Sequence, residues 1–204
     1  MTTSGTPAPS REIAATTPGG FVAALFTGLT ELTARDDLSR TDRAAETGRL
    51  LERSLDLGTL ARYSAGAGWA EASGPERARY LRLFREWALG VAAGRLADLS
   101  AGDMGAATLV VDTVEDAGGD RLVRSRVPLQ GGVPLRLDWR LRAGDDGWRI
   151  VDVMIQGISF ALVHRRMIGG IVARGGGLPA ISEALARALD NGGYRPDDLL
   201  ATGE

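Results

Sequence analysis

The sequence predicts an α+β domain in which helices cover one curved antiparallel sheet, a meander of four strands. Three observations support this prediction. Apolar residues recur at helical spacing in the first half of the chain, short alternating segments separated by glycine turns follow, and helical spacing returns near the C-terminus. With 204 residues, 44% hydrophobic and 25% charged, the chain suits a single domain with tails.

The first half of the chain is predicted to be helical. The spacing of apolar residues predicts a helix over Phe21–Ala34, a second helix with Thr41–Asp42 at its N-cap, and a short third helix over Asp56–Tyr63. Gly66 and Gly68 should interrupt the pattern before a longer helix begins. That helix has the clearest start, because Ser73 can cap it and Glu76 stands three positions later. We expect it to carry a stripe of long apolar side chains and to end near residues 100–102.

Four strands are predicted in the second half, and their short connections require antiparallel neighbours. Their expected ranges are Ala106–Glu115, Arg121–Leu129, Val133–Arg142 and Trp148–Gln156. In the third strand, leucine and tryptophan alternate with arginine and aspartate. In the fourth, alternation places Val151, Val153 and Ile155 on one face and Ile150 on the other.

Two helices are predicted after the sheet, one over about Ser159–Arg174 that residues 175–177 end, and one over Ala180–Leu189 that Pro179 opens. Residues 1–19 are rich in Thr, Ser, Pro and Gly, so we expect a disordered tail there. Residues 20–190 would form the single domain, and residues 191–204 a flexible C-terminal tail.

The composition excludes several classes of chemistry. The chain has no cysteine, which removes thiol nucleophiles, disulfides and cysteine metal sites. All 24 basic residues are arginine, so a P-loop and Schiff-base catalysis lack their lysine. His164 is the single histidine, so a two-histidine metal site cannot form within one chain. Because the net charge is −2, no basic field indicates a nucleic-acid partner.

The stretch Gly147–Ile171 is the most informative part of the chain. It opens with Gly-Trp at 147–148, and further positions of a family signature follow in order. The matching residues here are Gly147, Trp148, Asp152, Gly157, Ser159 and Arg165. An earlier block matches through Asp56, Leu60, Ala61, Gly68, Trp69, Phe84 and Trp87. Together these blocks resemble the MlaC family, also called toluene-tolerance proteins, which includes an HpnM-like branch associated with hopanoid synthesis. His164 and Ile168 depart from the family's usual Tyr and Phe.

The resemblance implies a soluble periplasmic carrier that shuttles phospholipid, or a hopanoid-type lipid, between the inner and outer membranes. Its partners would be an inner-membrane ABC transporter complex and an outer-membrane lipoprotein complex, and its role would be in outer-membrane lipid asymmetry. It implies no cofactor and no catalytic residue, with the bound lipid as cargo. Met1–Pro9 lacks the features of a signal peptide, so this chain is expected to be the mature form of an exported protein, after removal of its signal peptide.

The cargo would lie in an apolar cavity between the sheet and the helices. A two-tailed lipid has roughly thirty methylene groups, and at about 0.8 kcal/mol each their exposure to water costs tens of kcal/mol. The expected lining is Phe84, Trp87, Val91, Leu137, Trp139, Val153, Ile155, Phe160, Val163 and Met167. Arg165 and Arg166 would meet the lipid phosphate at the mouth, since guanidinium groups bind phosphate bidentately.

Other interpretations of the same residues stay open. The apolar set could fill an ordinary core, and the two arginines could be solvated or, for Arg165, paired with Asp152. A second function is an enzyme on an NTF2-like fold, an isomerase or hydratase for a small apolar substrate. Its candidate groups would be Asp112, Asp138, Asp152 and His164. A third is an interaction module that uses its glycine-rich loops.

Overall fold

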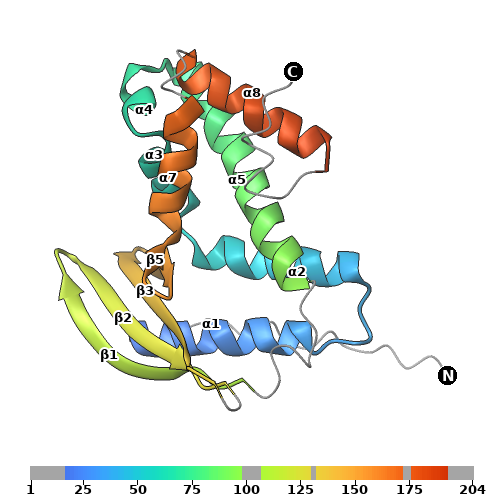
Figure 1. The fold of residues 1–204 in the computed structure, drawn as a ribbon, viewed down its shortest axis with the longest axis vertical. Helices are drawn as coiled ribbons and strands as arrows, with labels where there is room; N and C mark the ends of the chain where they lie inside the picture. Colours follow the sequence, from blue (N-terminus) through green and yellow to red (C-terminus); the bar gives the residue numbers. More distant parts are fainter. Residues whose placement is uncertain (1–16, 98–106, 130–131, 172–175, 193–204) are drawn as a thin grey trace.

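The computed structural model describes residues 17–97, 107–129, 132–171 and 176–192. The N-terminal tail up to residue 16, the predicted end of the long helix near residues 100–102, residues 172–175 and the C-terminal tail from residue 193 lie outside these ranges. Figure 1 shows the sheet and α1 at one end of the molecule, α2 beside them, and the remaining helices at the other end. The helices are α1 (Pro18–Thr33), α2 (Arg40–Ser54), α3 (Leu57–Ala65), α4 (Ala67–Glu71), α5 (Gly74–Ala97), α7 (Phe160–Ile171) and α8 (Gly177–Asp190).

The sheet confirms the predicted antiparallel meander and adds a short fifth strand. Its strands are β1 (Val110–Ala117), β2 (Asp120–Val127), β3 (Leu135–Gly144), β4 (Gly147–Ile155) and β5 (Ile158–Ser159), hydrogen-bonded in the order β1-β2-β3-β4-β5. A two-residue turn joins β4 to β5. Both turn residues have positive φ, 52° at Gln156 and 82° at Gly157, which glycine adopts without steric cost.

A β-bulge in β4 changes which side chains share a face. The register pairs Arg140 with Asp152 but Leu141 with Ile150, so Val151 is an extra residue. The prediction that Ile150 lies opposite Val151, Val153 and Ile155 was therefore wrong. Ile150 packs in the same cluster as Leu141, and the bulge shifts the alternation by one position.

Side-chain caps begin most of the helices. The Thr17 hydroxyl accepts from the Gly20 N–H at 3.2 Å, and α1 begins at Pro18, three residues before the predicted start at Phe21. Ser39, rather than Thr41–Asp42, caps α2 by accepting from the Asp42 N–H at 3.1 Å. Asp56 caps α3, because its Oδ1 accepts from the Thr59 N–H at 2.8 Å. Before α5, the Ser73 N–H donates to Glu76 Oε2 at 2.7 Å, the reciprocal half of the predicted capping box.

Glycine at position 66 separates α3 from α4. Gly66 has a φ of 56°, and this left-handed conformation ends α3. Gly68 lies inside the one-turn helix α4, so the predicted interruption is confined to Gly66.

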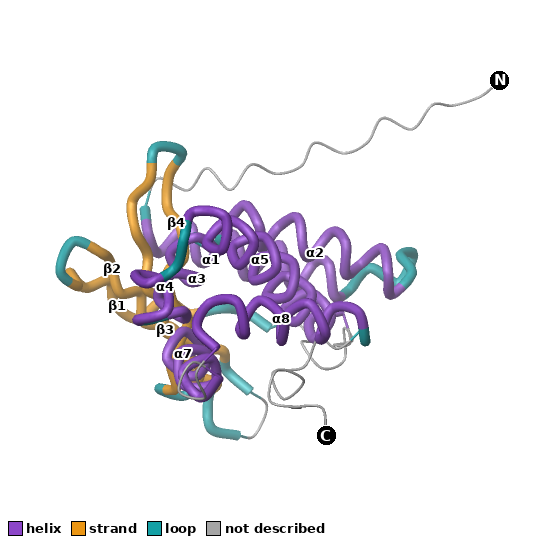
Figure 2. Tube along the Cα trace, turned by 90° about the horizontal axis from the view of Figure 1, so that it is seen from above, coloured by secondary structure: helices purple, strands orange, loops and turns teal. Residues whose placement is uncertain are grey.

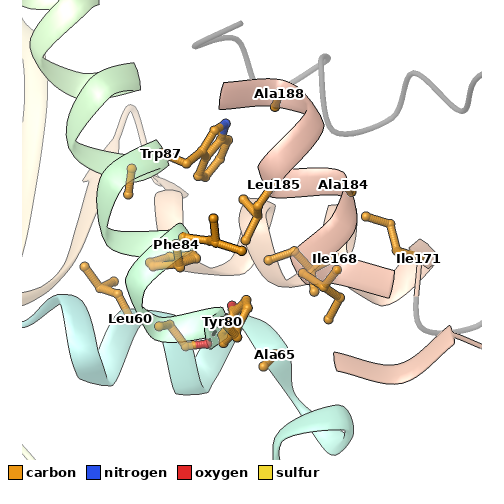
Figure 3. Packing of buried hydrophobic residues seen from close by; sticks show 14 of the residues in the cluster. Leu60, Ala65, Tyr80, Phe84, Trp87, Ile168, Ile171, Ala184, Leu185 and Ala188 are labelled. Atoms are coloured by element: carbon orange, nitrogen blue, oxygen red, sulfur yellow. Dashed lines mark hydrogen bonds between the residues drawn. The ribbon is translucent and has the colours of Figure 1, made fainter. Parts of the chain in front are cut away.

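Two apolar clusters stabilise the molecule. The sheet cluster joins α1 and the end of α2 to one face of β2, β3 and β4; Leu25, Leu141 and Ile150 are buried in it. The helical cluster joins α3, α5, α7 and α8 around Tyr80 and Trp87 (Figure 3). The view from above shows α5 and α2 side by side, with the strands gathered along one edge of the helices (Figure 2). The second cluster makes the helical end a packed unit in its own right.

Candidate functional site

The structure divides the predicted lining into three groups. The first group lies in the helical cluster. Phe84, Trp87 and Val91 on α5 are buried there, and Met167 on α7 is partly buried and packs against the cluster. The Phe84 and Trp87 ring centroids are 6.1 Å apart and tilted by 53°, a common packing of aromatic pairs (Figure 3).

The second group lies on the inner face of the sheet. Leu137 and Trp139 are buried and Val153 is partly buried in the sheet cluster. Trp139 Nε1 donates to the Ser125 hydroxyl at 3.0 Å, and that hydroxyl donates to the Leu137 carbonyl at 2.5 Å. This inward-facing tryptophan therefore has its polar atom satisfied within the sheet.

The third group is exposed. Ile155, Phe160 and Val163 have 48%, 38% and 37% of their surface accessible, and Ile158 and Leu162 beside them have 64% and 38%. All five lie between the end of β4 and the second turn of α7. The ten predicted residues thus form two packed groups and, together with Ile158 and Leu162, an exposed apolar strip at the sheet–helix junction.

Two elements connect the packed groups. Helix α5 contributes Phe84 and Trp87 to the helical cluster, and Leu89 and Leu96 pack against the sheet cluster. Leu55, between α2 and α3, packs against both clusters. Its neighbour Asp56 donates its N–H to the Ile150 carbonyl at 2.9 Å, which fixes this junction to β4. We call the boundary between the clusters, along α5 and Leu55, the seam.

His164 is buried and contacts two aromatic side chains of the predicted lining, Trp87 and Phe160. Its Nδ1 lies 2.8 Å from the Phe160 carbonyl one turn earlier in α7. Its ring centroid is 5.1 Å from that of Trp87 in an edge-to-face arrangement, and 3.9 Å from that of Phe160. His164 therefore links α7 to α5 at the place where the helical cluster meets the exposed strip.

The two predicted headgroup arginines lie on the outside of α7. The guanidinium of Arg165 stands 4.8 Å from the ring centroid of Tyr63, a cation–π contact that joins α7 to α3. Asp152 instead accepts from the Ser159 hydroxyl at 2.6 Å and from the Ala161 N–H at 3.0 Å. It thus holds the first turn of α7 on the sheet. The described residues contain no ion pair between Arg165 and Asp152, so the alternative pairing was wrong.

The carboxylates considered for catalysis serve structural contacts. Asp112 pairs with Arg126 across β1 and β2. Asp138 is buried and lies 3.4 Å from Arg124 and 3.3 Å from Arg136. These contacts place both carboxylates in the ion pairs of the sheet's outer face. Within the described part of the chain, no three His, Cys, Asp or Glu side chains are grouped to hold a metal ion.

A polar depression of about 300 Å³ lies where α2, α3, α5 and β4 meet. Its lining is Glu52, Leu55, Asp56, Leu57, Gly58, Arg85 and Arg149, and it contains none of the ten predicted lipid-lining residues. Glu52 and Arg85 form an ion pair across it. Sequence reasoning missed this grouping because its charges come from three separate helices and a strand.

The fold and these side chains define an α+β protein that presents apolar residues from a curved sheet and from a helical layer toward a common junction. The chain belongs to the MlaC family, since the model described as MlaC protein matches residues 22–187. No curated protein sequence matches it. Among the residues that the structure describes, no helix has the length and hydropathy required to cross a bilayer.

A solved structure shares the fold. It is the phospholipid-binding protein from Ralstonia solanacearum in complex with a phospholipid, with a TM-score of 0.69 and 19% sequence identity. The similarity covers 84% of this chain and 96% of that one. It confirms the predicted fold class at an identity where the sequences have diverged widely.

Proposed function

We propose that this protein binds a phospholipid, or a lipid of similar shape, and carries it between membranes through the periplasm. The observation that carries the proposal is membership of the MlaC family over residues 22–187. The fold shared with a phospholipid-binding protein supports it. In the role we propose, an inner-membrane ABC transporter complex and an outer-membrane lipoprotein complex exchange lipid with the carrier.

The acyl chains would enter at the exposed strip and extend along the seam. Ile155, Phe160 and Val163 provide apolar surface at the entrance. Behind them lie the packed residues of both clusters, Trp87 on the helical side and Trp139 on the sheet side. A lipid inserted there would exchange side chain–side chain contacts for side chain–acyl contacts. The apolar environment of the chains is then similar in carrier and bilayer, so transfer needs no large change in free energy.

The headgroup would lie outside, near α7. Arg165 and Arg166 are exposed on this helix, and a guanidinium group can donate two parallel hydrogen bonds to a phosphate. Arg165 is already oriented by its contact with Tyr63, which reduces the entropy that it loses on binding an anion.

Native mass spectrometry of gently purified protein tests the proposal. We expect a mass excess equal to a phospholipid, which disappears after organic extraction and returns after incubation with vesicles. Val153→Trp should abolish this excess because the larger ring fills the space beside Trp139 on the inner face. Leu137→Asp should do the same through an unpaired charge.

A matched variant separates lost binding from lost folding. Val114→Trp makes the same change on β1, at a position that is already 46% exposed, and should retain the full lipid load. If Val153→Trp stays folded and still carries a full load, the lining assignment is wrong. If the wild-type chain acquires no lipid from vesicles, the carrier function itself is wrong.

A further inference from the structure

The exposed apolar strip differs from the rest of the surface in both hydrophobicity and charge. The described residues expose nine large apolar side chains, and five of them lie in the nine positions from Ile155 to Val163. Single exposed apolar residues are normal on a protein surface, but a contiguous group marks a contact surface.

The sequence segment that contains the strip is positively charged although the whole chain is slightly negative. Between Asp152 and Glu183 the sequence contains no Asp or Glu, but it contains three arginines, whereas the chain as a whole has a net charge of −2. No acidic residue between Asp152 and Glu183 therefore offsets the arginines of this segment.

Helix α7 presents a mixed apolar and cationic face to the outside. Its buried residues are Ala161, His164, Ile168 and Ile171. Arg166 follows Leu162 by four positions and Val163 by three, so these exposed side chains share the opposite face. Such a face is typical of helices that lie in the interface of a membrane.

The β4–β5 turn extends this face beyond the helix. Ile155 and Ile158 are cross-strand partners on either side of the turn. A side chain added at Gly157 would lie 3.1 Å from Arg136 Nη2, so an arginine stands directly beside the turn. In Figure 1, β5 leads into the foot of α7 at the edge of the sheet, which makes the turn and the helix neighbours in space.

We propose that the β4–β5 turn and the outward face of α7 form a docking surface for a bilayer with anionic headgroups. Ile158 and Leu162 would enter the boundary between headgroups and acyl chains, while Arg166 would meet lipid phosphates. The charge of the partner follows from the excess of arginine in this stretch. Docking brings the entrance of the proposed lipid site to the membrane, but it is a property of the surface and does not require bound cargo.

Cosedimentation with vesicles tests the docking surface. The probes are vesicles of phosphatidylcholine alone and of phosphatidylcholine mixed with phosphatidylglycerol, with lipid-extracted and untreated protein. We expect the wild type to bind the mixed vesicles and to bind the neutral ones more weakly. The Arg166→Glu variant should bind the mixed vesicles with roughly fivefold lower affinity than the wild type. High salt should weaken the binding to mixed vesicles.

The double variant Ile158→Ser, Leu162→Ser should lose at least about tenfold in vesicle affinity, since two apolar side chains no longer enter the membrane. Both residues are exposed and outside the two packed clusters, so the melting temperature of the double variant should stay unchanged. Val114→Ser is the matched control, an exposed apolar residue outside the strip, and should bind vesicles like the wild type.

Three results would overturn the docking surface. The first is a double variant that binds vesicles as tightly as the wild type, and the second is a wild type with the same affinity for neutral and anionic vesicles. The third is a wild-type dimer in light scattering that becomes a monomer in the double variant. The last would show that the strip joins two copies of the chain. If the wild type binds anionic vesicles through the strip but never acquires a lipid, the docking surface stands and the carrier function is wrong.

Discussion

The β2–β3 pair and the stretch from Val153 to Ile171 differ in the exposure of their apolar side chains and in the pairing of their arginines. In β2 and β3, all six arginines form ion pairs with carboxylates, and the apolar residues of the inner face are mostly buried. In the second stretch, five large apolar side chains are exposed and two arginines have no carboxylate nearby in the sequence. The difference indicates that the first region stabilises the fold and that the second is kept available for contact.

The largest difference should appear when one apolar side chain is removed from each region. Leu141→Ala on β3 should lower the free energy of unfolding by about 3 kcal/mol, because the side chain is fully buried and leaves a cavity. Ile158→Ala should lower it by less than about 0.5 kcal/mol. Chemical denaturation of both variants measures the contrast, and equal losses would show that the strip is as structural as the sheet.

The next largest effect on the free energy of unfolding should come from neutralising Asp120, a buried carboxylate that pairs with two of these arginines. Asp120 accepts from Arg140 Nε at 2.7 Å and from Arg142 Nε at 2.8 Å, and it is buried although both arginines are half exposed. Asp120→Asn should cost about 2 kcal/mol at neutral pH, less than a fully buried pair because water can solvate the released arginines. An unchanged denaturation midpoint would contradict this role.

The same carboxylate predicts a pH dependence. The hydrogen bond from Arg142, followed by that from Arg140, holds the pKa of Asp120 below its ordinary value of 3.8. The stabilisation is therefore complete above that ordinary pKa and is lost as the pH falls through the lower, folded-state value. The stability gap between wild type and Asp120→Asn should be constant near neutral pH and should narrow below about pH 4. A gap that is unchanged in acid would exclude the ion pair as its cause.

The smallest predicted effect tests a neutral hydrogen bond in the same region. Ser125→Ala removes the acceptor of Trp139 Nε1 and the donor to the Leu137 carbonyl inside the sheet. Leaving these buried groups unpaired should cost about 1 kcal/mol, measured by denaturation. The lipid load should fall only if Trp139 changes its orientation, so a full load with reduced stability would locate the effect in the sheet.

Local patterns in the sequence predict most of the elements but not their pairing. Except for the one-turn helix α4, the described helices and the four longer strands follow from apolar spacing and glycine turns, and the structure confirms them within a few residues. The bulge at Val151 leaves no trace in the alternation of β4, because it arises from how β4 pairs with β3. Ser39 and Thr41 are equally suitable cap residues by type, and the conformation of the preceding loop decides between them.

The candidate site could be predicted only as a set of apolar side chains. Periodicity correctly indicates that Trp87 and Trp139 face inward, but it does not show that they belong to separate clusters. Ile155 and Phe160 have the same pattern as core residues, and their exposure follows from the absence of a described element over them. The structural role of Asp152 depends on a hairpin that brings Ser159 back to β4.

The two margins of this sheet are protected in different ways. At one margin, β1 carries an extra residue at Asp112 and a row of charged side chains. At the other margin, the backbone of Asp56 occupies the Ile150 carbonyl, and β5 covers the last residues of β4. A bulge, charged side chains and a short covering strand are features that hinder pairing of a sheet edge with a strand from another molecule. Because the β4–β5 turn nearby exposes apolar side chains, this protection of the sheet margins limits edge-to-edge aggregation at high concentration.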